Sequence, residues 1–196
     1  MTLTGISFGR EIAAAAARHG LDSRLLAAVA AQESGGPGSD SGRNVTGDGG
    51  HGHGLFQIDD RWHDFAATPA AEDPAANADY AAGLLSGLLK RFGGDVRAAL
   101  STYNAGSPGA RGTVTTWPDG SRLAYADSVL RHLGRLGGSL TRSVSVDAAA
   151  LGNAAGFAQQ PPLQPFRSFT SEMQAAGAAC EDADRRMAAL INPSDT

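Results

Sequence analysis

The chain has 196 residues, of which 42% are hydrophobic and 18% are charged, and its formal net charge is −4. This length has room for one core-forming domain and an appendage, whereas two full domains would be a tight fit. The acidic balance without a run of Lys and Arg argues against nucleic acid as a partner, the single cysteine Cys180 excludes an intrachain disulfide, and no apolar stretch reaches the ~20 residues of a membrane span.

Two helices are predicted near the start of the chain. Residues 7–19 form the first, which ends at Gly20 because glycine readily adopts the left-handed conformation that closes helices. A capping residue, Asp22 or Ser23, opens the second helix, which runs to about Glu33. A Gly-Gly-Pro sequence then stops this helix.

A glycine-rich region follows the second helix. Residues 38–54 combine glycines with Ser, Asp and Asn, which is typical of a loop or a short β-hairpin. Residues 55–58, Leu-Phe-Gln-Ile, form a short apolar island. This island is predicted to be either a buried strand-like piece or the start of a helix.

Three more helices are predicted further along the chain. An N-cap followed by proline opens one over residues 73–92, where large apolar residues recur at spacings of four. A second helix lies within residues 95–106, between a capping aspartate and a glycine. After a turn at residues 117–120, residues 122–136 form the last helix with one apolar side. The domain is therefore predicted to be mainly α-helical.

The composition changes after Gly137-Gly138. Residues 139–167 are rich in Ser, Ala, Gln and Pro, which indicates a linker. Residues 168–196 carry apolar side chains at alternating spacings of four and three, as in a helix with a heptad seam. Such a helix either packs on its own domain or binds a protein partner. The predicted organisation is a helical domain over residues 1–138, a linker and a C-terminal helical appendage.

Glu33 is the first candidate for catalysis. It lies three, four and seven positions after Ala30, Val29 and Leu26, so its carboxyl shares the apolar side of the second helix. Partial removal from water disfavours the ionised form and raises the pKa of a carboxyl. A carboxyl that is protonated near neutral pH can donate its proton to the leaving oxygen of a glycoside. The alternative is a glutamate at the helix boundary that reaches solvent.

Three blocks of sequence give this glutamate a context. The first joins Gln32-Glu33-Ser34 to residues 47–59, Gly-Asp-Gly-Gly-His-Gly-His-Gly-Leu-Phe-Gln-Ile-Asp. The second is Tyr-Asn-Ala-Gly at residues 103–106, and the third is Tyr-Ala-Asp-Ser-Val at residues 125–129. In this order, over about half of the chain, the blocks resemble the goose-type lysozymes and the related soluble lytic transglycosylases.

The resemblance implies a fold, a reaction and a set of residues. The fold would be lysozyme-like and mainly α, with a short β-hairpin or loop region. The reaction would cleave the β-1,4 bond between N-acetylmuramic acid and N-acetylglucosamine in peptidoglycan glycan strands, with no cofactor. Glu33 would be the general acid, and Asp48 and Asp59 would hold an attacking water. The implied substrate-binding residues are His51, Gln57, Tyr103, Asn104 and Tyr125.

Several of these residues also have simpler interpretations. Tyr103 and Tyr125 lie on apolar helix faces, where either can serve mainly as a core residue. Asp59 is also placed to cap the segment that follows it. His51 and His53 suggest a metal site, but the lack of a third well-spaced ligand favours a sugar groove or solvent. We therefore expect no metal site.

Two reaction products follow from the same general acid. Hydrolysis uses a water that a second carboxylate orients, whereas lytic transglycosylation uses the muramoyl C6 hydroxyl and leaves a 1,6-anhydro end. Among the lytic transglycosylases that the chain resembles, the second acidic positions are typically absent. The presence of both Asp48 and Asp59 therefore favours hydrolysis, with an inverting geometry if the carboxylates stand far enough apart for a water.

Other classes of function stay open. A non-catalytic glycan-binding module or a structural protein of a virion or secretion system could keep the same fold. The first residues are not typical of a secretory signal, because Arg10 and Glu11 interrupt the apolar stretch. We therefore expect a protein made in the cytoplasm that acts at the cell wall, as a phage lysin or a specialised-secretion effector.

Overall fold

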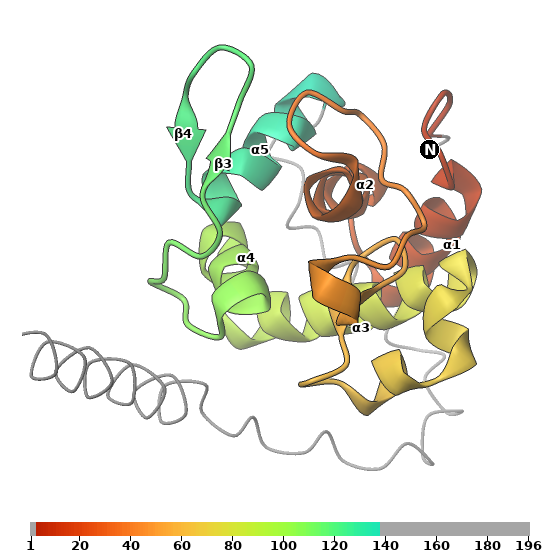
Figure 1. The fold of residues 1–196 in the computed structure, drawn as a ribbon. Coiled ribbons are helices and arrows are strands. Elements are labelled where there is room, and N and C mark those ends of the chain that lie inside the picture. Colours follow the sequence, from red (N-terminus) through yellow and green to blue (C-terminus); the bar gives the residue numbers. More distant parts are fainter. Residues whose placement is uncertain (1–2, 138–196) are drawn as a thin grey trace, which may run out of the picture. The chain divides into compact units, whose positions relative to one another are not determined.

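The computed structural model describes residues 3–137 of the chain (Figure 1). The predicted linker at 139–167 and the predicted C-terminal helix at 168–196 lie outside the described residues. The boundary at residue 138 and the partner-binding helix therefore stay predictions.

The described part of the chain is mainly helical, as predicted. Between residues 3 and 137 the α-helices are α1 (Gly9–His19), α2 (Ser23–Ala30), α3 (Pro74–Arg91), α4 (Val96–Ala105) and α5 (Tyr125–Arg135). None of these helices combines the length and the apolar character that a membrane crossing requires.

The helix ends follow the capping signals of the sequence. The carboxylates of Asp22, Asp73 and Asp95 each accept a hydrogen bond from a backbone N–H in the first turn of the helix that follows. Gly20 and Gly106 adopt the left-handed conformation directly after α1 and α4. The predicted caps and terminating glycines are therefore confirmed.

Helix α2 is the most enclosed helix of the described residues. Every residue from Leu25 to Ala30 is at most 1% exposed. The helix packs against α1 and α5, while α3 packs against α1 and α4 (Figure 1). Four of the six residues from 25 to 30 are alanine or valine, so the neighbouring elements approach its backbone closely. This packing fixes the direction in which the chain leaves α2.

The α-helical geometry of α2 ends before Glu33. Residues Ala31–Gly35 form a π-turn, in which the N–H of Gly36 donates to the carbonyl of Ala31 at 2.9 Å. The helix predicted to run to about Glu33 is therefore present, but its last turn is a π-turn, which is wider than an α-helical turn. Single π-turns within helices are frequent at functional sites.

Two short antiparallel hairpins complete the fold. The first pairs β1 (Gly52–His53) with β2 (Ile58–Asp59), so the predicted loop or hairpin is a hairpin at its end. The second pairs β3 (Thr115–Thr116) with β4 (Arg122–Leu123) and lies beside α5 (Figure 1). The last helix was expected from residue 122, but pairing of residues 122 and 123 with β3 delays its start to residue 125.

The first hairpin is tied to the helices by buried polar groups. Leu55 and Phe56 are buried between the two strands, so the apolar island is a core segment. The side chain of Asn77, from α3, accepts from the N–H of Phe56 at 2.8 Å and donates to the carbonyls of His53 and Ala71. Three short 3-10 helices flank the hairpin: Asp48–Gly50, Asp64–Ala67 and Pro69–Glu72.

Candidate active site

Glu33 lies in the π-turn at the end of the enclosed helix α2. Glu33 is only partly exposed, and burial of its carboxyl raises the pKa of this group to about 7. A hydrogen bond from Tyr125 acts in the opposite direction and lowers this pKa. The carboxyl is therefore populated in both its protonated and its ionised form near neutral pH. This is the electrostatic environment that the sequence predicted for it.

Two tyrosines border this carboxyl. Tyr125, buried at the start of α5, donates its hydroxyl proton to Oε1 of Glu33. Tyr103, from α4, has a buried hydroxyl with no hydrogen-bond partner in the described part of the chain. Burial and the charge of Glu33 raise the pKa values of both tyrosines well above the ordinary value, so both hydroxyls keep their protons. The structure brings Glu33, Tyr103 and Tyr125 together, and Tyr125 is a core residue as well.

A chain of hydrogen bonds lies beside Glu33 that the sequence did not reveal. Gln32 donates from Nε2 to Oγ1 of Thr115 at 2.8 Å and accepts at Oε1 from the hydroxyl of Ser128 at 2.5 Å. The same hydroxyl accepts from Nε1 of Trp117 at 2.9 Å. These residues come from the π-turn, the second hairpin and α5. They share no motif, so only the fold brings them together.

Asn104 holds the segment that leads into the second hairpin. Its Oδ1 accepts from the N–H of Thr113 at 2.8 Å, and its Nδ2 donates to Oγ1 of the same residue at 3.3 Å. A Cβ added to Gly112 would lie 2.1 Å from Oδ1 of Asn104, and Gly112 has a φ of +59°. The close approach of this segment to Asn104 therefore depends on glycine.

Gln57 spans the first hairpin. Its Nε2 donates to the carbonyls of Val45 at 2.7 Å and Gly54 at 2.8 Å. Its Oε1 faces Gly47 and Gly52, where an added Cβ would approach to 2.1 Å and 2.7 Å. The side chain that was predicted to contact substrate thus organises the glycine-rich loop, and its substrate contact stays a prediction.

Asp48 and Asp59 meet at one arginine. Arg61 contacts both carboxylates, and the backbone N–H of Arg61 also donates to Oδ1 of Asp59 at 2.8 Å. The last bond holds the turn at residues 60–62, so Asp59 does not cap a helix beginning at Arg61, the alternative that the sequence left open. Hydrogen bonds from Arg61 are the main cause that lowers the pKa of Asp59. These two aspartates are hydrogen-bonded to Arg61, whereas the carboxyl of Glu33 is bonded to Tyr125.

His51 belongs to a separate polar cluster. Its Nδ1 lies 2.7 Å from Oδ1 of Asp60, whose other oxygen lies 3.1 Å from Nε2 of His53. Nδ1 of His53 lies 2.9 Å from Oε1 of Glu72. The hydrogen bonds of His53 with Glu72 and Asp60 raise the pKa of His53. Among residues 3–137 no group of three or more histidines, cysteines and acidic residues is arranged to hold a metal ion.

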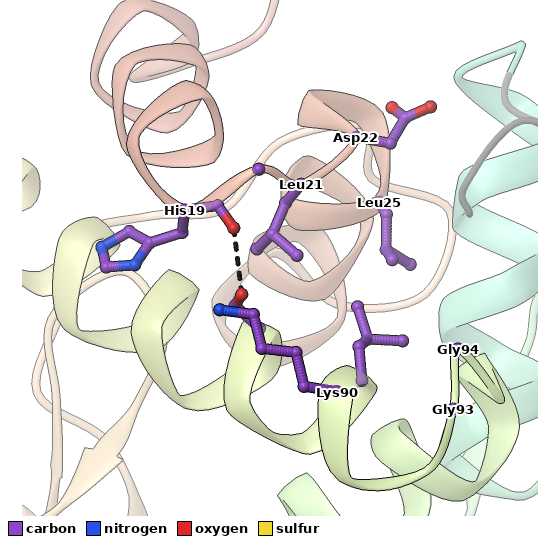
Figure 2. A pocket seen from close by; sticks show the side chains of 10 residues that line it. His19, Leu21, Asp22, Leu25, Lys90, Gly93 and Gly94 are labelled. Carbon is purple, nitrogen blue, oxygen red and sulfur yellow. Dashed lines mark hydrogen bonds between the residues drawn. The ribbon is translucent and has the colours of Figure 1, made fainter. Parts of the chain in front are cut away.

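A pocket elsewhere on the domain contains none of the predicted site residues. It lies where the end of α1, the start of α2 and the C-terminal half of α3 meet, and Figure 2 shows His19, Leu21 and Lys90 around it. The hydroxyl of Ser86 donates to the carbonyl of His19 at 2.9 Å on its wall. Glu33 and its tyrosines are therefore identified by their chemistry rather than by this cavity.

Comparison with known protein families gives a match over more than half of the chain. The family model described as the transglycosylase SLT domain matches residues 10–117. The matched residues run from α1 through Glu33, both aspartates and Tyr103 to Trp117 of the second hairpin. No curated protein and no solved structure gives a significant match.

Proposed function

The chain belongs to the transglycosylase SLT family, which supports a peptidoglycan lytic transglycosylase type of activity, and from this premise we propose that Glu33 is the general acid. It cleaves the β-1,4 bond between N-acetylmuramic acid and N-acetylglucosamine. The observation that carries the proposal is the enclosed carboxyl of Glu33 with a pKa of about 7. General acids work best when their pKa lies near the working pH.

The bond cleavage uses the protonated form of Glu33. Its proton passes to the glycosidic oxygen as the bond from that oxygen to the anomeric carbon of the muramoyl residue breaks. The departing N-acetylglucosamine keeps this proton as a hydroxyl group, and Glu33 becomes a carboxylate. The hydrogen bond from Tyr125 then stabilises the carboxylate, because a hydroxyl donates more strongly to a charged acceptor.

We further propose that the muramoyl C6 hydroxyl attacks the anomeric carbon. A new bond forms from O6 to the anomeric carbon, and the C6 hydroxyl proton passes to the Glu33 carboxylate, which returns to its starting form. The product is a 1,6-anhydromuramoyl end. One carboxyl with a pKa of about 7 can serve as acid and then as base.

The contacts of Arg61 support this product over the hydrolysis that the sequence favoured. A carboxylate that activates water must accept a proton, and a lowered pKa makes it a weaker base. Asp59 has a lowered pKa because Arg61 binds it, and Arg61 also contacts Asp48. Both aspartates then act mainly in holding the glycine-rich loop.

Tyr103 is proposed to contact the substrate. Its hydroxyl is buried, keeps its proton and has no partner in the described part of the chain. Buried hydroxyls are nearly always hydrogen-bonded, so a bound sugar oxygen is a suitable acceptor. His51, Gln57 and Asn104 stay proposed groove residues, and their observed bonds fix the loops that would form its walls.

The test is the variant Glu33→Gln, assayed on purified peptidoglycan with mass spectrometry of the released fragments. Loss of the titratable proton should reduce cleavage by about 10²- to 10⁴-fold. Glu11→Gln makes the same chemical change on α1 and serves as the matched control. Wild-type digests should contain 1,6-anhydro ends. Retained activity in Glu33→Gln would defeat the general-acid role, and reducing muramoyl ends alone would establish hydrolysis.

A further inference from the structure

We propose that Ser128 is a positioning residue for this reaction, which acts through Gln32 on the catalytic Glu33 and links the β3–β4 hairpin to the π-turn. The inference rests on the function proposed above. Ser128 lies outside residues 10–117, which the family model matches. Its role is inferred from the hydrogen-bond chain that runs from Trp117 through Ser128 and Gln32 to Thr115.

The directions of the bonds in this chain are fixed by chemistry. The indole of Trp117 can only donate, so the hydroxyl oxygen of Ser128 must accept from it. The single hydroxyl proton of Ser128 is then directed to Oε1 of Gln32. This sets the amide so that its Nε2 donates to Thr115. Each bond therefore determines the direction of the next. Of the two hydroxyl groups in this hydrogen-bond chain, that of Ser128 belongs to a residue with no exposure to solvent.

Helix α5 holds two adjacent residues of the π-turn. Tyr125 binds Glu33 and Ser128 binds Gln32, and these two donors lie three positions apart on one face of α5. Both bonds come from one helix and reach neighbouring residues of the π-turn, so α5 holds this turn at two successive positions.

The other end of the chain is anchored in the second hairpin. Trp117 is 3% exposed, and its ring packs against His132 at a centroid distance of 4.6 Å. The guanidinium of Arg131 lies over the same ring at 4.3 Å. Trp117 thus packs against two residues of α5, while Thr115 of β3 is only partly buried. Movement of β3 would pull on Gln32 directly.

Loss of the Ser128 hydroxyl would leave two groups without their partner, the buried indole N–H of Trp117 and the part-buried Oε1 of Gln32. The amide of Gln32 would then turn, and the neighbouring carboxyl would lose its alignment with Tyr125. A misplacement on the order of 1 Å at a catalytic group lowers the rate by up to about 100-fold. The effect should fall on kcat rather than KM, because the Ser128 side chain is fully buried and its hydroxyl donates to Gln32.

The experiment compares four variants of the full chain on soluble glycan strands. Ser128→Ala should lower kcat by about 10- to 100-fold with KM within about twofold of wild type. Thr115→Val removes the outer acceptor at a partly buried position and should lower kcat by a smaller factor, whereas Thr115→Ser keeps the hydroxyl and should restore it. Ser86→Ala removes the hydroxyl of another buried serine, which lies on α3 and donates to the carbonyl of His19 at the end of α1, and this variant should match wild type.

A second readout does not depend on activity. The titration of the Glu33 carboxyl carbon, followed by NMR, should move to lower pH in Ser128→Ala, because a displaced carboxyl regains water. Unchanged kcat and unchanged titration in Ser128→Ala and Thr115→Val would overturn the proposal, as would failure of Thr115→Ser to restore kcat. If Ser128→Ala does not fold, the two Thr115 variants decide. If wild type does not cleave glycan, the titration alone decides, and the proposed function fails separately.

Discussion

The hydroxyl of Tyr125 donates a hydrogen bond to the carboxyl of Glu33, a residue 92 positions earlier in the chain. Two opposing influences therefore act on the pKa of Glu33: burial raises it, and the bond from Tyr125 lowers it. Their balance lies at about 7. A helix that begins at residue 125 thus tunes an acid that lies at the end of the most enclosed helix.

The variant Tyr125→Phe should move the pH profile of cleavage to higher pH. The change keeps the buried ring and removes the donor that lowers the pKa of Glu33, so the carboxyl should hold its proton above pH 7. The maximal rate should fall, because the ionised intermediate loses its hydrogen bond. The pH dependence of kcat checks both effects. Tyr80→Phe, which removes a hydroxyl bonded to His63 instead, is the control. A pH profile of kcat that does not shift in Tyr125→Phe would contradict the prediction.

The variant Glu33→Gln should gain stability over wild type as the pH rises. The pKa of Glu33 is raised on folding from 4.5 to about 7. Burial of its charge therefore does not lower the free energy of unfolding below pH 4.5, and lowers it in full above pH 7. A shift of this size corresponds to up to about 3 kcal/mol. The difference in unfolding free energy between variant and wild type should therefore grow from pH 4 to pH 8. Urea titrations at both pH values measure it, and a constant difference would show that Glu33 does not titrate as proposed.

The variant Asp59→Asn should keep most of the activity and the same product. Asp59 is bonded to Arg61 and has a lowered pKa, so we expect it to hold the loop rather than to activate water. The loss of the ion pair should cost about 1 kcal/mol or less, because Arg61 is exposed. Mass spectrometry of the digest should still find 1,6-anhydro ends. A loss of activity as large as that in Glu33→Gln would instead assign Asp59 to the reaction.

The variant Gly112→Ala should weaken cleavage through Asn104. The new Cβ would lie 2.1 Å from Oδ1 of Asn104. Residue 112 also has a φ of +59°, which residues other than glycine rarely adopt. The segment at Thr113 must then shift away from the site, at a cost of about 1–3 kcal/mol. Gly109→Ala is the matched control, because no atom lies within 4 Å of its added Cβ. Thermal unfolding and cleavage rates should separate the two variants, and equal behaviour would contradict the assignment.

The helix boundaries were predictable because their causes are local. Asp22, Asp73 and Asp95 bind backbone N–H groups two or three residues further on, so a short stretch of sequence contains both partners. The same holds for Gly20 and Gly106, whose left-handed conformation depends on the residue itself. The apolar surroundings of Glu33 followed from the periodicity of one helix.

The remaining features depend on contacts between distant segments. The π-turn coincides with the bond from Ser128 to Gln32, 96 positions apart, and no local pattern signals it. The delayed start of α5 depends on pairing with β3, in strands too short to show alternation. The ion pairs of Arg61 with both aspartates require the hairpin to bring Asp48 beside Asp59. The opposite charge two residues after Asp59 was the one local signal for them.

The family match ends at Trp117, whereas α5 begins at Tyr125. A segment that is moved into another protein with a complete site must therefore extend beyond the residues that the family model matches. A fragment cut at residue 117 would carry the acid and most of the groove residues but neither of the donors that orient the π-turn. A segment able to carry the proposed activity must therefore include α5, which begins at the third sequence block and lies beyond the residues that the family model matches.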